Sequence, residues 1–367
     1  MIAVYIEMSA METISTVVNK RWLAVDLFSG SGAVTAGLKQ EGFEVVAAVD
    51  SDLIACKTYA LNHPEVRLVS DDIKKANPLD INVALNGREL DLLVVCAPCQ
   101  PFSSQNRKKA ESDPRMDLIF ECVKFARVLN PTVIFFENVP GIVNAGLLEL
   151  LSKRLKKLGY KLSVPLKIDA ATLGVPQRRE RCILVASKYD AIVKSFGVTL
   201  TAAKPKTVRD AIGYLPSLRS GETSLDPLHR ARKHHAITLE RLKHIPKDGG
   251  SRSALPEYLQ LACHKNKNND FPDVYGRMKW SGVAPTLTTG CTDLTRGRFV
   301  HPEDDRALSL REAALLQTFP KDYIFYGNSG QVARQIGNAV PVEMARRIAC
   351  HLKELTVAST FGCGNLN

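Results

Sequence analysis

The sequence contains no apolar run of the roughly 18 to 20 residues that a membrane-spanning helix needs. Its first residues are apolar but are interrupted by Glu7, and no basic leader precedes them, which argues against a signal peptide. The nine cysteines have no spacing typical of a disulfide framework, so we expect reduced thiols in a cytosolic compartment. No internal repeat and no low-complexity tract is visible. These absences favour a globular cytoplasmic protein without a membrane partner.

The composition is that of an ordinary globular protein. Hydrophobic residues make up 45% of the 367 residues and charged residues 24%, so the chain can bury a sizeable core. This length predicts two domains, or one large domain that carries an insertion.

Charge is distributed unevenly along the chain. The formal net charge is +11, and residues 201–300 alone hold 17 basic and 9 acidic side chains. Five of the eight histidines also fall in this window: His229, His234, His235, His244 and His264. A local basic excess indicates a polyanionic partner, although a solvated basic face without a partner is almost equally compatible with charge alone.

The pattern of residues 22–190 alternates between buried strands and amphipathic helices. Short apolar runs predict strands at residues 22–28, 44–49, 66–69, 91–96, 132–136 and 182–186. Helical spacing predicts helices at residues 33–41, 52–61, 116–129 and 147–158. Such alternation predicts an α/β fold with a doubly wound, mostly parallel sheet, which binds its ligand at the carboxyl ends of the strands.

The second half of the chain has a different pattern. Residues 200–300 are rich in Pro, Gly, Lys, Arg and His and have weak periodicity. Helical spacing returns at residues 308–317, and residues 342–355 form a clear amphipathic pattern. We therefore expect an inserted region followed by a return to the first domain.

A glycine-rich motif, DLFSGSG at residues 26–32, follows the first predicted strand. Gly30 and Gly32 would allow a tight turn and the close approach of a ligand at a helix N-terminus. Asp50 ends the second strand, where an acid can bind ribose hydroxyls. Thr35 stands where a dinucleotide fingerprint has its third glycine, so a purely structural turn remains an alternative.

Cys99 lies directly after the strand predicted at residues 91–96, in the sequence APCQPFS. A cysteine at this edge of the sheet is a candidate nucleophile, and a buried structural thiol is the alternative. Cys96 and Cys99 also form a C-x-x-C pair, but Cys96 ends a buried strand and would point into the core, whereas a redox pair needs both sulfurs near the surface.

Three further motifs complete the set. Glu137 follows the next strand in the sequence FENVP and brings a carboxylate to the same edge of the sheet. Arg179 and Arg181, in QRRER, can project the same way on an extended chain and pair with Glu137 or with phosphate. The sequence QIGNAVP at residues 335–341 opens the last predicted helix. Each motif is modest alone, but the order of all five is highly specific.

The five motifs together resemble those of the DNA (cytosine-5) methyltransferase family, of the bacterial or phage type, from about residue 23 to residue 352. The resemblance implies a Rossmann-like methyltransferase domain at residues 1–190 and 325–367, with a smaller target-recognition domain inserted at residues 191–324. It also implies S-adenosylmethionine as cofactor and a catalytic set of Cys99, Glu137, Arg179 and Arg181, with no metal.

The resemblance assigns the remaining site residues as well. Cofactor contacts are expected from Phe28, Gly30, Gly32, Asp50, Asp72, Ile73, Pro98, Asn338 and Ala339. Double-stranded DNA is the expected partner, with contacts from Gln100, Ser103, Arg230, Arg232 and Lys233. We also expect a monomer associated with the nucleoid, which acts either beside a cognate restriction endonuclease that does not touch it or as an orphan methylase without one.

This chain departs from the family pattern at two places. The family often has a small residue where this chain has Cys96, and Glu followed by a large apolar residue where it has Asp50 and Ser51. Ser51 cannot stack on an adenine, so the adenine pocket must be lined differently. An RNA cytosine-5 methyltransferase, a catalytically silent DNA-binding regulator and a thiol oxidoreductase remain alternatives, but none explains all five motifs as well.

Overall fold

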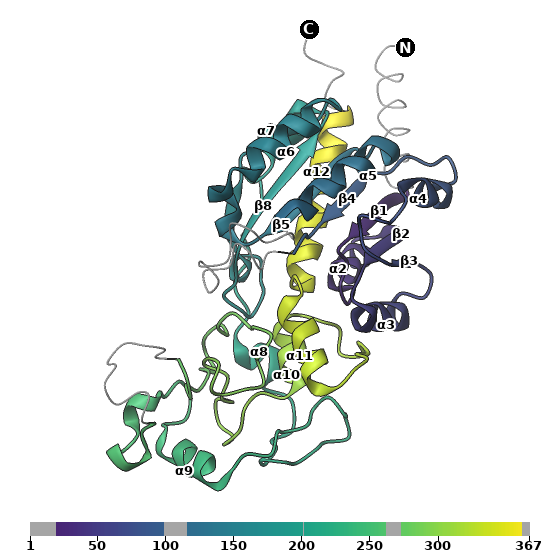
Figure 1. Ribbon diagram of the computed structural model, residues 1–367. Helices are drawn as coiled ribbons and strands as arrows, with labels where there is room; N and C mark the ends of the chain where they lie inside the picture. Colours follow the sequence, from purple (N-terminus) through teal and green to yellow (C-terminus); the bar gives the residue numbers. More distant parts are fainter. Residues whose placement is uncertain (1–19, 99–115, 201, 262–272, 362–367) are drawn as a thin grey trace, which may run out of the picture.

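The computed structural model describes residues 20–98, 116–200, 202–261 and 273–361. Within these ranges one sheet with helices on both faces forms the larger part of the molecule, and a region with little regular structure lies beyond one end of the sheet (Figure 1). Cys99, Gln100 and Ser103 are outside the described residues.

The sheet has eight strands with the order β3-β2-β1-β4-β5-β8-β6, and β7 also pairs with β8. Its strands are β1 (Trp22–Leu27), β2 (Phe43–Asp50), β3 (Arg67–Ser70), β4 (Leu92–Val95), β5 (Val133–Asn138), β6 (Lys161–Leu162), β7 (Leu166–Asp169) and β8 (Glu180–Ser187). The first five strands are mutually parallel, whereas β8 runs antiparallel to β5, β6 and β7. The predicted doubly wound, mostly parallel α/β fold is confirmed.

Among the described residues, α12 is the one long helix, and the other helices are short. The α-helices are α2 (Ala33–Gln40), α3 (Leu53–Asn62), α4 (Pro78–Leu85), α5 (Cys122–Leu129), α6 (Leu147–Lys156), α7 (Asp190–Ser195), α8 (Val208–Ile212), α9 (Ala236–His244), α10 (Leu310–Leu316), α11 (Ser329–Asn338) and α12 (Val342–Phe361). The 3-10 helices are η4 (Met116–Glu121), η5 (Pro140–Ala145), η6 (Ala170–Thr172), η7 (Arg252–Ala254) and η8 (Glu257–Leu259). In the described part of the chain, no helix combines the length and the apolar character required to cross a bilayer.

Two apolar clusters fix the sheet between its helices. Side chains of α4, α5 and α6, among them Ile81, Phe125 and Leu151, cover one face. The other face packs against α2, α7 and α12 through residues such as Leu38 and Met344. Strands β1, β4 and β5 are buried along their whole length, which explains why they read as continuous apolar runs in the sequence.

Sequence patterns missed the shortest elements. The two-residue β6 and four-residue β7 are too short to develop a recognisable period. Helix α4 was not predicted either, although its start has a recognisable local signal. The Asn77 side chain accepts from the backbone N–H of Leu79, and Pro78 occupies the first turn. The predicted helix at residues 116–129 is divided into η4 and α5.

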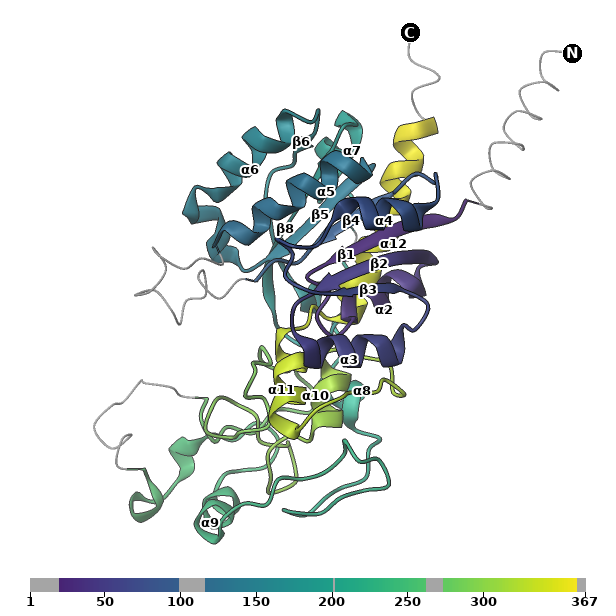
Figure 2. The same ribbon diagram turned by 45° about the vertical axis from the view of Figure 1, so that its right-hand side comes forward.

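Between α7 and α10, the regular structure of the described residues consists of short helices and isolated β-bridges. Helices α8, α10 and α11 lie next to the sheet domain, and α9 lies farthest from it (Figures 1 and 2). One apolar cluster joins Ala33 and Ala36 of α2 to residues of this region such as Trp280 and Leu308. A separate cluster includes Leu242, Val274 and Leu294.

Candidate active site

The predicted site residues follow the carboxyl ends of neighbouring parallel strands. The glycine-rich loop comes after β1, Asp50 ends β2, Asp72 follows β3 and Pro98 follows β4. Glu137 is the last residue but one of β5. Because parallel strands present their carboxyl ends at one edge, the sheet brings the termini of these five segments to a common edge.

The loop after β1 is tied to the end of β2. The backbone N–H of Gly30 donates to Asp50 Oδ2 at 2.7 Å, and Asp50 Oδ1 accepts from the N–H of Asp52 at 2.8 Å. Burial raises the pKa of the Asp50 carboxyl above its ordinary value. Phe28 and Gly30 both have left-handed backbone conformations, with φ of 62° and 53°. A Cβ atom added at Gly30 would have no neighbour within 4 Å, so open space adjoins the loop there.

Packing against neighbouring side chains adds a further requirement for glycine at position 32. A Cβ atom at this position would lie 2.7 Å from the His63 ring and 2.8 Å from the Tyr323 hydroxyl. Its φ of 88° also favours glycine. The side of Gly32 on which a Cβ atom would lie is therefore filled by two side chains of the protein.

A buried polar chain lies under the glycine-rich loop. Asp26 Oδ2 accepts a hydrogen bond from Thr35 Oγ1 at 2.8 Å, and Thr35 Oγ1 is also 2.8 Å from the Tyr59 hydroxyl. Thr35 thus replaces the third glycine of a dinucleotide fingerprint with a hydrogen-bonding side chain. Burial raises the pKa of Asp26 to about 7. Asp26 Oδ1 and Ser29 Oγ are buried and have no hydrogen-bond partner among the described residues.

The segment after β3 has one exposed and one buried candidate. Asp72 is exposed, and its Oδ1 accepts from the backbone N–H of Lys74. Ile73 is 4% exposed and packs in the core, while its carbonyl accepts from Lys124 Nζ at 2.5 Å. Lys124 on α5 therefore fixes the backbone of this segment.

Glu137 and Arg181 form an ion pair at the carboxyl end of β5. Arg181 Nε lies 2.8 Å from Glu137 Oε1, and both side chains are largely buried. The antiparallel register of β5 and β8 pairs Glu137 with Ile183 and Asn138 with Cys182, which brings Arg181 next to the carboxylate. Burial, followed by the nearby Glu137 charge, raises the pKa of Cys182 to about 11, so this thiol stays protonated at neutral pH.

Asn138 connects this pair to the segment that leads into Cys99. Its Nδ2 donates to the carbonyl of Ala97 at 3.1 Å, and its Oδ1 accepts from the backbone N–H of Val139 at 2.9 Å. Ala97 is buried and Pro98 is half-buried. The hydrogen bond fixes the Ala97 backbone, two residues before Cys99, beside the end of β5.

Arg179 has different partners from Arg181. Its side chain is buried and donates to the carbonyls of Leu287 and Gly337, each at 3.0 Å. These contacts join the segment before β8 to the inserted region and to α11. Of the two arginines predicted to pair with Glu137 or with phosphate, Arg181 forms the pair with Glu137, and Arg179 donates to these two carbonyls.

The neighbouring Gln177 makes a second connection of the same kind. Its Oε1 accepts from the N–H of Leu287 at 2.8 Å, and its Nε2 donates to Gln317 Oε1 at 2.9 Å. Gln317 in turn donates to the carbonyls of Ile336 and Ala339. Sequence reasoning missed Gln317, because no local signal distinguishes a buried glutamine from a solvated one.

The last motif forms the end of one helix. We had expected it to open the following helix, and the structure corrects this prediction. Residues Gln335 to Asn338 form the final turn of α11, and α12 begins after Pro341. Gly337 packs against the inserted region, since a Cβ atom there would lie 2.4 Å from the Thr288 backbone. Asn338 is exposed and Ala339 is half-buried, so both side chains are accessible beside this contact.

The three basic candidates for DNA contact lie close together in sequence and are exposed. Arg230, Arg232 and Lys233 precede α9. Arg232 forms an ion pair with Asp293 at 3.4 Å, which restrains one of the three.

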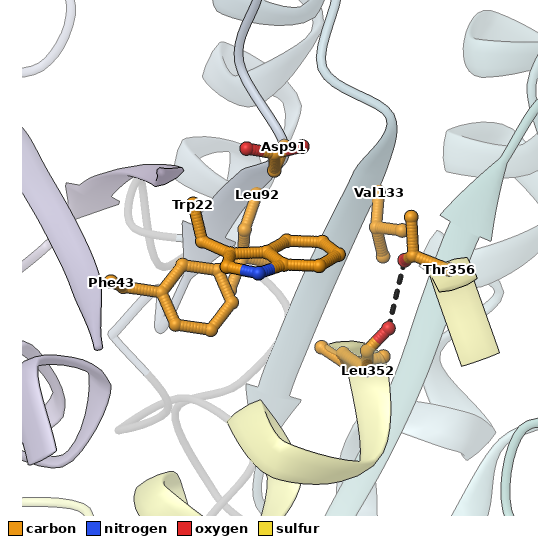
Figure 3. Close-up of a pocket in the computed structure, with 7 residues that line it drawn as sticks. All are labelled: Trp22, Phe43, Asp91, Leu92, Val133, Leu352 and Thr356. Atoms are coloured by element: carbon orange, nitrogen blue, oxygen red, sulfur yellow. Dashed lines mark hydrogen bonds between the residues drawn. The ribbon is translucent and has the colours of Figure 1, made fainter. Parts of the chain in front are cut away.

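A small hollow at the opposite edge of the sheet is a feature of the fold. It is lined by residues at the starts of β1, β2, β4 and β5 and by α12: Trp22, Phe43, Asp91, Leu92, Val133, Leu352 and Thr356 (Figure 3). The Asp91 carboxylate already accepts from the N–H of Leu23 and pairs with Lys20. Since ligands of such sheets bind at the carboxyl ends of the strands, this hollow is at the wrong edge for the site.

Solved structures share this architecture. A DNA modification methyltransferase encoded within an Escherichia coli prophage superposes with a TM-score of 0.71 at 24% identity, covering 91% of this chain and 99% of the other. The DNMT2 structure from Spodoptera frugiperda gives a TM-score of 0.61 at 20% identity, covering 90% and 99%. At these identities the likeness concerns the fold.

Sequence relatives define the family. The family model described as C-5 cytosine-specific DNA methylase matches residues 23–354. The Type II methylase M.HgiDII of Herpetosiphon aurantiacus is 40% identical over 340 residues, covering 90% of this chain and 94% of the relative. The Type II methyltransferase M1.HphI of Haemophilus parahaemolyticus is 31% identical, covering 89% and 85%. The chain belongs to the C-5 cytosine-specific DNA methylase family and is a DNA (cytosine-5) methyltransferase.

Proposed function

We propose that this enzyme methylates carbon 5 of a flipped-out cytosine in double-stranded DNA through a covalent adduct with Cys99, using S-adenosylmethionine. The observation that carries the proposal is the arrangement at the ends of β4 and β5. Glu137 is paired with Arg181, and Asn138 holds the backbone two residues before Cys99. A nucleophile, a carboxylic acid and a guanidinium would thereby converge on one pyrimidine ring.

Carbon 5 of cytosine is a poor nucleophile until a thiolate adds to carbon 6. In this scheme the Cys99 sulfur forms a bond to carbon 6, and the electrons of the 5,6 double bond move toward carbon 5. Glu137 in its acid form donates a proton to N3 and relieves the charge on the ring. Arg181 orients the carboxyl group and can donate to the base carbonyl.

The remaining steps restore the aromatic ring. Once carbon 5 carries the methyl group, a base removes the proton from carbon 5, the double bond re-forms and the Cys99 thiolate leaves. A base inside a duplex cannot reach this pocket, so it must be flipped out at a cost of a few kcal/mol.

The residues around the glycine-rich loop fit a cofactor. Open space adjoins Gly30, the first turn of α2 has no side-chain cap, and Asp26 Oδ1 and Ser29 Oγ are buried without partners among the described residues. Phe28, Gly30, Asp50, Asp72, Ile73, Pro98, Asn338 and Ala339 would hold it, and Gly32 would support the loop. S-adenosylmethionine, when bound, supplies an electrophilic methyl group.

The inserted region is proposed as the DNA-reading part. Its local charge of 17 basic against 9 acidic residues at 201–300 supports phosphate contacts. We place its start after residue 200, later than the position expected from sequence, because Ile192 and Phe196 pack in the cluster of the sheet. Its end remains near residue 324. Arg179 would act as a junction between this region and α11 through its two carbonyl contacts.

The relatives that carry Type II names support a place in restriction and modification, in which a separate endonuclease cuts the unmethylated site. Bisulfite sequencing of DNA from cells that express the enzyme would identify the methylated sequence. Conversion at every cytosine of that DNA would contradict methylation of carbon 5.

The decisive experiment traps the covalent adduct. An oligonucleotide with 5-fluorocytosine at the target should form a denaturation-resistant complex with the enzyme when S-adenosylmethionine is present, because fluorine cannot leave as the proton does. Cys99→Ala should form no complex, whereas Cys96→Ala should form it as the wild type does. Trapping that persists in Cys99→Ala would exclude the proposed nucleophile.

A further inference from the structure

Tyr323 reaches across from the segment between α10 and α11 to the glycine-rich loop. Its hydroxyl donates to the carbonyl of Ser31 at 2.5 Å. The His63 ring, at the end of α3, completes the contact: its Nε2 lies 3.2 Å from the carbonyl of Gly32 and 3.2 Å from the Tyr323 hydroxyl. Both side chains are buried, and they occupy the space that the missing side chain of Gly32 leaves.

The direction of each hydrogen bond follows from the available protons. A carbonyl only accepts, so the single proton of the Tyr323 hydroxyl goes to Ser31. His63 Nε2 must then be the donor toward the Tyr323 oxygen and the Gly32 carbonyl. His63 Nδ1 is left as an acceptor, and Lys39 Nζ lies 3.5 Å from it. Burial, followed by the Lys39 charge, lowers the pKa of His63 to about 4, which keeps the ring neutral.

Tyr323 is held in place by contacts that do not involve its hydroxyl. Its ring packs against Phe319 and Phe325, with centroids 4.8 and 5.3 Å apart. The chain beside it is fastened to α3, because Asn62 donates to the carbonyl of Ile324 and accepts from the N–H of the same residue. The hydroxyl therefore adds little to the docking of this segment and acts on the loop.

This contact acts on two consecutive peptide groups of the loop, together with backbone hydrogen bonds from the Gly32 N–H to the Ser29 carbonyl and from the Ala36 N–H to the Gly32 carbonyl. Because a peptide group is planar and trans, fixing the carbonyls of Ser31 and Gly32 also fixes the N–H groups of Gly32 and Ala33. Ala33 is the first residue of α2, whose N-terminal N–H groups have no side-chain cap. The contact thus sets the geometry of the loop where the ligand would meet it.

We propose that Tyr323 and His63 are positioning residues that hold the glycine-rich loop in the shape that binds the cofactor. This inference rests on the proposed function, in which the loop binds S-adenosylmethionine. Neither residue touches the reacting atoms. They act through the loop backbone, and Tyr323 does so from the chain that follows the inserted region, so the two parts of the molecule share the cofactor site.

The test compares two tyrosines that differ in their contact with the loop. Tyr323→Phe removes the hydroxyl bonded to Ser31 and keeps the ring, whereas Tyr326→Phe removes a more exposed hydroxyl that contacts Lys57 at 3.4 Å. Calorimetry should show S-adenosylmethionine binding to Tyr323→Phe roughly tenfold more weakly than to wild type, about the value of one hydrogen bond. Tyr326→Phe should bind as wild type does. The KM for the cofactor should rise similarly in Tyr323→Phe, while kcat changes less than about twofold.

A second pair of variants tests the donor role of His63. His63→Gln keeps an N–H donor of similar reach and should stay within about threefold of wild-type affinity, whereas His63→Leu should lose as much as Tyr323→Phe. Wild-type affinity in Tyr323→Phe, or an equal loss in Tyr326→Phe, would overturn the positioning role. So would a lower melting temperature in Tyr323→Phe with unchanged affinity. If the wild-type enzyme itself binds no S-adenosylmethionine, the proposed function fails first, so the two failures are distinguishable.

Discussion

The sheet domain and the inserted region are stabilised by different kinds of contact. In the sheet domain, apolar side chains on both faces of the strands pack against helices. In the inserted region the regular elements are short, and the two largest fully buried side chains of the described chain are arginines, Arg277 and Arg306. Regular elements satisfy their own backbone groups, whereas an irregular chain needs side chains to do so.

Arg277 shows how one cation can organise a set of loops. It is fully buried and donates to the carbonyls of Leu242 and Ile245 at the end of α9. It also donates to the carbonyls of His301 and Asp304 and pairs with the Asp305 carboxylate. A single guanidinium thus connects α9 to the loop before α10, and its five donors make this possible.

Arg306 performs the same task nearer to the sheet. Its guanidinium binds both oxygens of Glu312 at 2.8 Å and also pairs with Asp304. Glu312 belongs to a capping box with Ser309 at the start of α10. The salt bridges lower the pKa of Glu312 although burial opposes this, so the carboxylate remains charged in the interior.

The difference shows how a region with little regular structure is stabilised. Many of its backbone carbonyls have no partner in a helix or a sheet, so a buried polar network of side chains binds them instead. Such a network is stabilising only while every member is paired, and removal of one member leaves the others without partners.

The largest effect is expected from Arg277→Met, which keeps an unbranched apolar stem and removes all the donors. The substitution leaves the buried carbonyls of Ile245 and His301 without their donor, at roughly 1 to 3 kcal/mol each, and leaves Asp305 with Lys247 as its cationic partner. Limited proteolysis should cut the inserted region faster, and DNA binding should be lost. Cofactor binding, measured by calorimetry, should change much less. An equal loss of cofactor affinity would mean that the two regions unfold together.

A smaller effect is expected from Asp26→Asn, which tests the buried charge of the sheet domain. Asp26 accepts from Thr35 but forms no ion pair within the described residues. Its pKa is raised from 3.8 to about 7, so the folded chain binds more protons than the unfolded chain between these values, and stability falls as the pH rises through this window. The variant should therefore be more stable than wild type by roughly 2 to 4 kcal/mol at pH 8 and equal to it near pH 4.

Thermal unfolding of both proteins across pH 4 to 8, without cofactor, would measure this difference. A constant difference in melting temperature at all pH values would show that ionisation of Asp26 is not the cause.

The smallest effect on stability is expected from combined neutralisation of Arg230, Arg232 and Lys233 to glutamine. These side chains are exposed, and the ion pair between Arg232 and Asp293 lies at the surface. The free energy of unfolding should therefore change by less than about 1 kcal/mol. The salt dependence of DNA binding should change instead, by up to about 0.9 in log–log slope for each lost phosphate contact. An unchanged slope would remove these residues from the interface.

Much of the fold and part of the site could be predicted from the sequence. The five parallel strands and most of the helices beside them were recognised because each is a local pattern of apolar residues, but α4 was not predicted. Their alternation predicted the doubly wound sheet, and the order of the strands explained why motifs 20 to 110 residues apart meet at one edge. The short β6 and β7 were missed because they exist only through their pairing with β8.

Interactions between distant residues were decided only by the tertiary structure. The sequence QRRER offered two equivalent arginines, but the register of β8 against β5 pairs Arg181 with Glu137, while Arg179 binds the carbonyls of Leu287 and Gly337, which are 108 and 158 residues away. Gly32 was recognised as a required glycine, but the packing of His63 and Tyr323 against it involves a residue, Tyr323, that lies 292 positions from the neighbouring Ser31.

Interactions differ in how far apart along the sequence the interacting residues lie, and this separation decides which of them can be predicted. Hydrophobic periodicity, helix caps and tight turns depend on residues within a few positions. The longer strands, the main helices and the chemical groups at the sheet edge could therefore be recognised from the sequence alone. Which buried donor meets which acceptor depends on the packing of whole elements. Only the tertiary structure therefore decided that Arg277 and Arg306 hold the inserted region, and that Tyr323 contacts the glycine-rich loop.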